Sequence, residues 1–450
     1  METKYSSASG PDAAEKLYEQ ARKVLPGGVS RNTIFRKPHP FYASSASGCY
    51  VTDIEGKKRV DFANNMASLI HGHSHPKIVE AVTEQLKRGS AFNMATEIEV
   101  RYAELLCERN PGFEKLRFVN SGTEAVMAMI KAARAYTGKS KIAKVEGAYH
   151  GVYDFAEVSQ TANPSNWGSL DKPNSVPVAV GTPQAVLDNV IVVPFNDVER
   201  TLTLLDQHSD EIACVLIDLI PHRVGLMPAS QEFIRALRDW TTKHQSLLAF
   251  DEVITFRTEY SGAQAHYDVT PDLTSLGKII GGGFPAGAFA GKSEIMRVLD
   301  PATKKLLLPH SGTFSANPIT MIAGYLAMEM YDRDAVDRLN ALTDKAKQQV
   351  EEAIKIADIK ACVTGAGSIF RVHFTEKPPR HYREAWIDPP SSKITGALLD
   401  YMYSHGIIMI NTCSATLSTV MTQLEIDHLS DALLKSFRLI KPELEKKQNS

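Results

Sequence analysis

Lys278 is the side chain of this 450-residue protein that is best suited to act as a nucleophile. It lies between an apolar run and the glycines at 281–283. A buried, dry position lowers the pKa of a lysine, and the neutral amine can then form a Schiff base with a carbonyl compound. Glycines nearby allow a ring or a phosphate to approach the backbone closely. The alternative is a surface lysine whose amine extends into solvent.

A hydroxyl-rich turn at residues 120–126 follows an apolar segment and opens a predicted helix. The Ser121 hydroxyl, the backbone N–H groups of Gly122 and Thr123 and the positive end of the helix dipole can hold a phosphate. The same turn can instead serve only to cap the helix, with Ser121 or Thr123 as N-cap. It is not a Walker loop, because no Gly-Lys-Ser/Thr sequence closes it.

Asp251 ends the apolar run 247–250, at the C-terminal edge of a predicted buried strand, where ligands of open α/β sheets collect. It can keep a bound pyridine nitrogen protonated, or it can cap the next segment. Tyr149 and His150 follow another short strand. One of these rings could stack on a ligand, unless the pair is a buried aromatic beside a hydrogen-bonded histidine.

Two further clusters carry weaker signals. Residues 311–318 form a second hydroxyl-rich turn ahead of an apolar helix, suited to a phosphate or to capping. His71, His73 and His75 alternate along the chain, but no second set of ligands accompanies them and no His-Glu-x-x-His is present. We interpret the three histidines as structural and expect no metal.

The elements that would position these residues follow from the apolar periodicity. A helix is expected over residues 12–25, and from 71 to about 330 helical patterns alternate with short apolar runs, which predicts a mostly parallel α/β sheet. Residues 159–189 are rich in Pro, Ser, Asn and Gly and predict a long surface loop. Helical periodicity continues at 323–331 and 341–356. Strands at 360–374 and 406–411 and a helix at 424–439 then predict a smaller α+β domain.

Size and composition limit the function classes. A chain of 450 residues exceeds one hydrophobic core, so two or three structural units are expected. The net charge of -2 offers no basic field for nucleic acid. The five cysteines are widely spaced without a Cys-x-x-Cys pair, which favours a reducing cytoplasm. No signal-peptide core is present and no apolar stretch approaches the roughly 20 residues that span a bilayer, so we expect no membrane segment.

The order of these features resembles the fold-type I pyridoxal-phosphate (PLP) enzymes. The similarity is closest to the class III aminotransferases, in the branch that contains glutamate-1-semialdehyde aminomutase and the amine and β-amino acid transaminases. The motifs that carry the resemblance are residues 25–28, 72–76, 120–125, 251–253, 276–283 and 312–313.

The resemblance implies a division into three parts. Residues 71–330 would form a large PLP-binding domain with a mostly parallel, seven-stranded type of sheet. Residues 331–450 would form the small C-terminal α+β domain. Residues 1–70 would supply an N-terminal helix and a segment that joins the small domain.

The resemblance also implies roles for the site residues. Lys278 would bind PLP as a Schiff base and then move the proton between substrate and cofactor, first as base and then as acid. Asp251 would pair with the pyridinium nitrogen, and Tyr149 and Val253 would sandwich the ring.

The remaining cofactor contacts are implied for Ser121, Gly122 and Thr123 at the phosphate, and for His150 and Asp218. Thr313 would reach the phosphate from the neighbouring subunit. A homodimer with shared active sites is therefore implied.

Several residues expected near the substrate differ from those of the related families. Asp218-Leu219 stands where the family usually has Glu-Pro, and His222-Arg223 stands where it has small residues. Residues 410–417 lack both the glutamate of the aminomutases and the arginine that β-amino acid transaminases carry near Thr412.

Two substrate residues follow from the same comparison. Met66 aligns near the pocket tryptophan of the aminomutases. Arg31 matches an arginine that binds a substrate carboxylate, although a surface ion pair is the alternative for it.

These residues favour a transaminase that moves an amino group from an amine or β-amino acid to a keto acid such as pyruvate, in a ping-pong cycle through pyridoxamine phosphate. The alternative is glutamate-1-semialdehyde 2,1-aminomutase, and the third hypothesis is a PLP-dependent racemase or epimerase. From a different class, a non-catalytic protein that retains the fold would not require Lys278, Asp251 and the phosphate turn to be intact.

Overall fold

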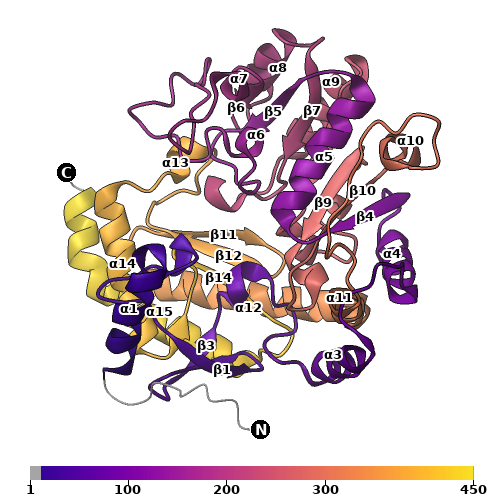
Figure 1. The fold of residues 1–450 in the computed structure, drawn as a ribbon. Helices are drawn as coiled ribbons and strands as arrows, with labels where there is room; N and C mark the ends of the chain where they lie inside the picture. The colour runs from indigo at the N-terminus through magenta and orange to yellow at the C-terminus, as the bar shows by residue number, and fades with distance from the viewer. Residues whose placement is uncertain (1–11, 449–450) are drawn as a thin grey trace.

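A seven-stranded sheet forms the core of the upper part of the molecule in the computed structural model, which describes residues 12–448 (Figure 1). Its strands lie in the order β4 (Lys115–Val119), β10 (Gly287–Gly291), β9 (Leu273–Gly277), β8 (Leu247–Asp251), β7 (Ile212–Ile217), β5 (Lys141–Val145) and β6 (Val190–Val193). Only β10 runs antiparallel to its neighbours within this sheet. The predicted α/β fold with a mostly parallel sheet is therefore confirmed.

Helices cover both faces of this sheet. Alternate residues of one strand enter different cores: Val215 and Ile217 of β7 pack on one side, and Cys214 and Leu216 on the other. Helix α5 (Gly122–Thr137) covers the second side, and α8 (Val198–Asp206) and α9 (Gln231–Lys243) cover the first. Strands buried on both faces explain why their sequences are apolar throughout.

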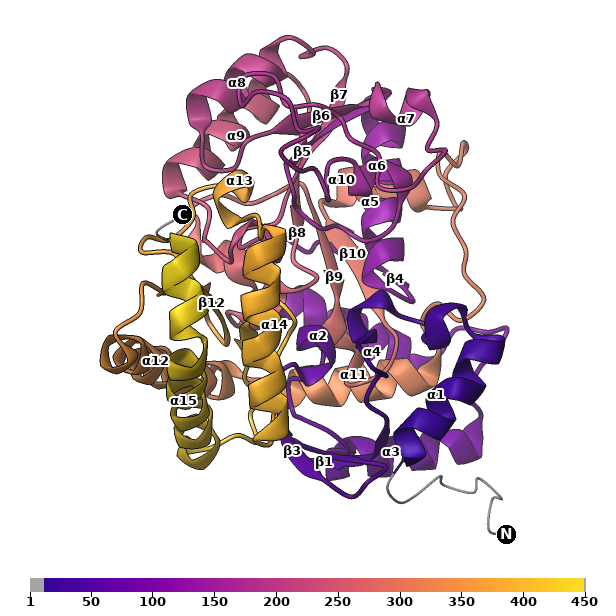
Figure 2. The same cartoon turned by 90° about the vertical axis from the view of Figure 1, so that its left-hand side faces the viewer.

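A second sheet of three strands forms in the C-terminal part, from β11 (Cys362–Ala366), β12 (Ile369–His373) and β14 (Ser414–Thr416). Three long helices accompany it: α12 (Arg333–Ala357), α14 (Pro389–Ser404) and α15 (Gln423–Gln448). Helix α15 packs against α12 and α14, and the turned view shows α14 and α15 running alongside each other (Figure 2).

The N-terminal part connects to this C-terminal part through a shared sheet. Helix α1 (Ala13–Val24) is followed by β1 (Ala43–Ser47), β2 (Tyr50–Asp53) and β3 (Lys58–Asp61). Strand β3 pairs in parallel with β13 (Ile407–Ile408), with Val60 opposite Ile407. Helices α3 (Pro76–Arg88), α4 (Glu97–Arg109) and α11 (Pro318–Met330) pack together beside them. The domain boundaries at 70 and 330 stay a prediction.

Several elements differ from the sequence expectation. The single strand expected at 360–374 is a hairpin, because the chain turns at Gly367, whose φ is 54°. Helix α14 was not indicated by periodicity, because it begins with two prolines and its apolar positions are interrupted by polar residues. Residues 159–189 contain only the short helix α7 (Gln184–Leu187), in agreement with the predicted long loop. No helix within residues 12–448 is long and apolar enough to cross a membrane.

Candidate active site at the strand ends

Asp251 lies at the C-terminal end of β8 and is almost fully buried. One carboxylate oxygen, Oδ1, accepts hydrogen bonds from Ser275 Oγ at 2.9 Å and from the Val253 backbone N–H at 3.1 Å. The other oxygen, Oδ2, lies 2.7 Å from His150 Nδ1. Three segments of the chain thus hold the carboxylate. Such contacts are needed where a carboxylate must keep one orientation toward a ligand.

His150 is fully buried behind this carboxylate. Burial lowers its pKa, and the hydrogen bond and charge of Asp251 oppose that shift only in part. The imidazole is therefore neutral, with Nδ1–H donating to Asp251. The second nitrogen, Nε2, is buried and has no hydrogen-bond partner within residues 12–448.

Lys278 follows β9 directly and adopts φ of 51°, a left-handed conformation that is uncommon for a residue with a side chain. Burial lowers the pKa of its amine, the Asp251 charge opposes this shift, and the Arg257 charge adds to it. Because β8 and β9 are parallel neighbours, with Asp251 opposite Ser275, the lysine and the carboxylate emerge at the same sheet edge. The structure therefore brings the two principal predicted residues together.

The predicted phosphate turn lies at the start of α5. Ser121 is the N-cap of this helix, and its hydroxyl oxygen accepts a hydrogen bond from the Glu124 N–H at 3.1 Å. The Ser121 O–H remains able to donate, and the first N–H groups of a helix have no partner within it. Both capping and phosphate binding are compatible with this geometry, so the role of Ser121, Gly122 and Thr123 stays a prediction.

Val253 connects the phosphate turn to the lysine. A Cβ on Gly122 would lie 2.7 Å from Val253 Cγ1, and one on Gly277 would lie 3.1 Å from the same atom. Two glycines therefore allow the turn, the valine and the strand before Lys278 to meet. Tyr149 is 42% exposed. Burial raises the pKa of its hydroxyl, and the charge of Asp251 raises it further, so the ring lies near that carboxylate.

Asp218 follows β7 at the same edge, on the strand next to β8. It is buried, and its Oδ1 accepts a hydrogen bond from the Ile220 N–H at 2.9 Å. Burial raises its pKa well above the usual range, and the charge of Asp251 raises it further. Its burial next to the Asp251 carboxylate therefore favours the neutral form of Asp218.

Thr313 follows Gly312, where a Cβ atom would lie 3.6 Å from the side-chain nitrogen of Asn120, so its segment passes the predicted phosphate turn of the same chain. It is exposed, in the segment that precedes α11. Its predicted contribution from a neighbouring subunit stays a prediction.

The histidines at 71 and 73 have protein partners. His71 Nδ1 lies 2.7 Å from Thr419 Oγ1 and its Nε2 lies 2.8 Å from the Ala327 carbonyl oxygen. His73 Nε2 lies 2.9 Å from Asp61 Oδ2. These contacts join segments of the fold, in agreement with a structural interpretation.

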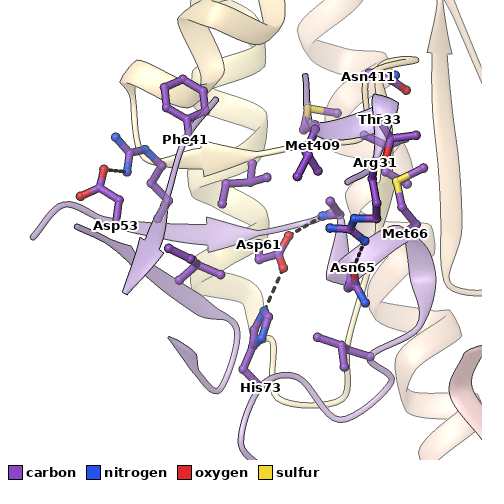
Figure 3. A pocket seen from close by; sticks show the side chains of 18 of the residues that line it. Arg31, Thr33, Phe41, Asp53, Asp61, Asn65, Met66, His73, Met409 and Asn411 are labelled. Carbon is purple, nitrogen blue, oxygen red and sulfur yellow. Dashed lines mark hydrogen bonds and ion pairs between the residues drawn. The ribbon is translucent and has the colours of Figure 1, made fainter. Parts of the chain in front are cut away.

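The two predicted substrate residues line one cavity of about 1160 Å³ (Figure 3). Arg31 donates from Nη1 to Asn65 Oδ1 at 2.8 Å, and Met66 lies next to this pair. Gly282 and Gly283, which follow Lys278 closely in the chain, also line the cavity. The carboxylates on its wall already have partners, since Asp53 bonds Arg59 at 2.6 Å and Asp61 bonds His73.

A left-handed turn presents Asn65 and Met66 to this cavity. The four residues Asn64–Ala67 of α2 all have positive φ, between 45° and 68°. Such a run costs free energy in residues other than glycine and persists only where surroundings enforce it. The Asn64 side chain anchors the turn by donating to the Thr416 carbonyl oxygen at 2.8 Å.

Sequence reasoning missed two kinds of residue. Ser275, which orients Asp251, depends on the register of β8 and β9 and leaves no signal in the sequence. Arg371 is buried in β12 and lies near His222 and Arg223. The sequence feature that could have identified Arg371 is its position as a charged residue within the apolar run 369–372.

These groups fit pyridoxal phosphate. Asp251 is a buried carboxylate without a cationic hydrogen-bond partner within the described chain, as a pyridinium nitrogen requires. The N-terminus of α5 suits a phosphate, and Lys278 supplies an amine of lowered pKa. Val253 and Tyr149 are available for the two faces of a ring.

Comparisons with known proteins give the same result. The family model for aminotransferase class-III matches residues 34–440. The glutamate-1-semialdehyde 2,1-aminomutase of Methanothermobacter thermautotrophicus is 38% identical over 396 residues, covering 88% of this chain and 90% of that protein. An omega-transaminase structure from Sphaerobacter thermophilus is 46% identical, with a TM-score of 0.93 and coverage of 95% of this chain and 98% of that chain. A transaminase structure with PLP bound is 40% identical, with a TM-score of 0.88 and coverage of 96% and 99%.

Proposed function

The chain belongs to the class III aminotransferases, and we propose that it is a transaminase that moves an amino group from an amine or β-amino acid to a keto acid such as pyruvate. The family is PLP-dependent, and PLP is the cofactor of this protein. The 46% identity to an omega-transaminase structure, above the 38% identity to an aminomutase, supports the proposal.

Lys278 and Asp251 have different roles toward the cofactor. When bound, PLP supplies an electrophilic carbonyl and an electron-withdrawing ring. Lys278 would hold the cofactor through its amine, and burial lowers the pKa of this amine, which favours the form that can take a proton from the substrate carbon and return it to the cofactor carbon. The Asp251 carboxylate, whose orientation Ser275 and His150 fix, would hold a proton on the ring nitrogen.

The observation that carries the choice of transaminase is the placement of Arg31. Arg31 lines the same cavity as the glycines that follow Lys278, and its hydrogen bond goes to a neutral amide rather than to a carboxylate. A guanidinium whose charge is not neutralised can bind the carboxylate of a β-amino acid donor. Residues 410–417 contain no acid that would serve an internal amino transfer.

The test starts from the purified holoenzyme. We expect bound PLP to give a visible absorbance band that is lost in Lys278→Ala, and we expect 1-phenylethylamine or a β-amino acid to bleach that band in the wild type. Pyruvate should then restore it. A colourless protein that takes up no PLP would refute the enzyme proposal.

The second candidate is the 2,1-aminomutase, favoured by the name of the 38% identical relative. It predicts turnover of glutamate-1-semialdehyde without any keto acid. If this compound is converted while amines and β-amino acids leave the spectrum unchanged, the aminomutase replaces our proposal.

A further inference from the structure

A partly buried basic cluster lies where the small C-terminal sheet meets the end of β7. We use this name for Arg223, Arg371 and His222 together with Thr412 and Ser414. Arg371 lies in β12 opposite Ser414 of β14, and its side chain is nearly fully buried. Thr412 Oγ1 lies 3.1 Å from His222 Nε2 and 2.9 Å from Ser414 Oγ, so the five residues form one connected group.

The positive charge of this cluster is not neutralised. Within residues 12–448, neither Arg223 nor Arg371 forms an ion pair, and the Nε atom of each is buried without a hydrogen-bond partner. Arg371 donates from Nη1 to the His222 carbonyl oxygen at 3.2 Å, and Arg223 reaches the hydroxyl of Tyr382.

Arg257, another buried arginine, differs from Arg223 and Arg371 in its hydrogen bonds. In Arg257, all three guanidinium nitrogens donate to oxygen atoms of the protein. A buried guanidinium with free donors is costly unless an anion completes its contacts.

The cluster follows β7, whose C-terminal end lies at the same edge of the large sheet as Lys278. Burial lowers the pKa of His222 to about 3, and the charges of Arg371, Arg223 and Lys278 lower it further. His222 is therefore neutral, and the positive charge of the cluster belongs to its two arginines. The cluster is separate from the phosphate turn, which belongs to the start of α5. The cluster is therefore available to an anion other than the cofactor phosphate, such as a group of the substrate.

We propose that Arg371 and Arg223 bind the carboxylate of the keto acid acceptor. This inference rests on the proposed function, because a ping-pong transaminase must accept two different substrates in turn. Arg31, in the cavity next to Met66, then serves the donor, while Arg371 and Arg223 serve the acceptor. The guanidinium group suits this task, since its planar donors match the two oxygens of a carboxylate.

The first experiment compares two acceptors that differ in the carboxylate. With 1-phenylethylamine as donor, kcat/KM is measured for pyruvate and for propanal in the wild type, Arg371→Gln, Arg223→Gln and the double variant. We expect each single substitution to lower kcat/KM for pyruvate about 10- to 100-fold, the usual effect of a hydrogen bond to a charged group. The value for propanal should change by about twofold or less.

Arg31→Gln is the matched control, because it removes a guanidinium from the donor side. It should leave the ratio of pyruvate to propanal unchanged. If Arg31→Gln alone abolishes the preference for pyruvate, or if Arg371→Gln and Arg223→Gln lower both acceptors equally, the inference is wrong.

A second measurement separates binding from folding. Propanoate, which has a carboxylate but no reactive carbonyl, should raise the melting temperature of the wild-type holoenzyme and not that of the double variant. Without propanoate, Arg371→Gln should be at least as stable as the wild type, because an unpaired buried charge is removed. A clear loss of stability in Arg371→Gln with no effect of propanoate on the wild type would identify a structural arginine and overturn the inference.

The two proposals fail in different ways. If propanoate stabilises the wild type through Arg371 but no acceptor receives an amino group, the transaminase proposal fails and the carboxylate site stands. If amino transfer to pyruvate proceeds and the variants keep the preference for pyruvate, only the carboxylate site is refuted.

Discussion

The carboxylate of Asp251 is positioned by residues that are distant in sequence. Ser275 and the Val253 N–H hold one oxygen, and His150 holds the other. His150 is neutral because burial lowers its pKa, so it orients the carboxylate without neutralising it. The remaining charge is available to a protonated ring nitrogen.

The substitution Asp251→Asn tests this arrangement. We expect kcat to fall about 100- to 1000-fold, because a neutral amide cannot keep the ring nitrogen protonated. Steady-state rates with 1-phenylethylamine and pyruvate measure the change. Ser275→Ala, which removes a hydrogen bond to the same carboxylate, is the control and should cost about 10-fold or less. If the Asp251→Asn variant keeps a kcat close to that of the wild type, the assigned role is contradicted.

For single residues, the sequence predicted where Asp251 and Lys278 lie along their elements, but it did not predict which side chains contact them. The placement of Asp251 at a strand end follows from the apolar run before it, and Lys278 follows from its glycine neighbours. The hydrogen bond from Ser275 requires the register between two strands, and the proximity of Arg371 to Arg223 requires the packing of two sheets. These are long-range properties that local patterns do not contain.

Among the elements, Arg257 contacts three segments that are distant from one another in sequence. It ends the 3-10 helix Thr255–Arg257 and donates to Ser368 Oγ at 2.8 Å, to the Ala67 carbonyl oxygen at 3.0 Å and to the Leu417 carbonyl oxygen. Ala67 ends the left-handed turn that carries Met66. The arginine therefore holds the substrate-side turn against the C-terminal part.

Replacing Arg257 with Met should destabilise the protein. Loss of the guanidinium leaves three buried oxygen atoms without their donor, and we expect the free energy of unfolding to fall by about 3 kcal/mol. Thermal and denaturant unfolding measure this. Arg134→Met is a suitable comparison, because Arg134 is half-buried and makes one hydrogen bond, to the Ser140 carbonyl oxygen. Equal stability of the two variants would show that the Arg257 contacts contribute nothing particular.

The boundaries of some helices can be predicted from neighbouring residues alone. The helix expected at 12–25 is α1 at 13–24, because a strong apolar stripe and a Pro-Gly-Gly stop define it. The left-handed turn at 64–67 could not be foreseen, because none of its residues is a glycine. Its conformation is imposed by contacts such as the one from Asn64 to Thr416.

On the scale of the whole molecule, buried neutral histidines make stability depend on pH. Burial lowers the pKa of His71 to about 4, that of His222 to about 3 and that of His373 to about 3. An unfolded chain binds protons at these residues below about pH 6.5, whereas the folded chain does not. Their contribution to stability is thus complete above pH 6.5 and is lost as the pH falls toward the folded values.

His71 alone should account for roughly 3 kcal/mol between pH 6.5 and 4. The charge of His75 lowers its pKa and that of Asp332 raises it, both less than burial does. His71→Gln keeps a donor for the Ala327 carbonyl oxygen and removes the titrating group. Unfolding measured from pH 7 to 4 should therefore show a shallower loss of stability in this variant. Identical slopes for variant and wild type would rule out His71 as a source of the acid sensitivity.

The last prediction concerns assembly. Large apolar side chains are exposed in two segments, with Met94 82% and Phe314 55% accessible. Such exposure is typical of surfaces that a partner covers. Phe314 follows Thr313, the residue expected to reach the phosphate of a second subunit. The exposed apolar groups beside Thr313 are therefore consistent with the predicted homodimer.

We expect Phe314→Glu to shift the protein toward monomer and to weaken PLP binding at the same time, because the partner's threonine leaves with the partner. Sedimentation velocity gives the mass, and dialysis followed by absorbance gives the bound PLP. Val180→Glu, which introduces the same charge at a fully exposed valine in the loop 159–189, should change neither quantity. A wild-type protein that is monomeric and keeps PLP as tightly as the variant would show that the site is complete within one chain, and Thr313 would then have no role in it.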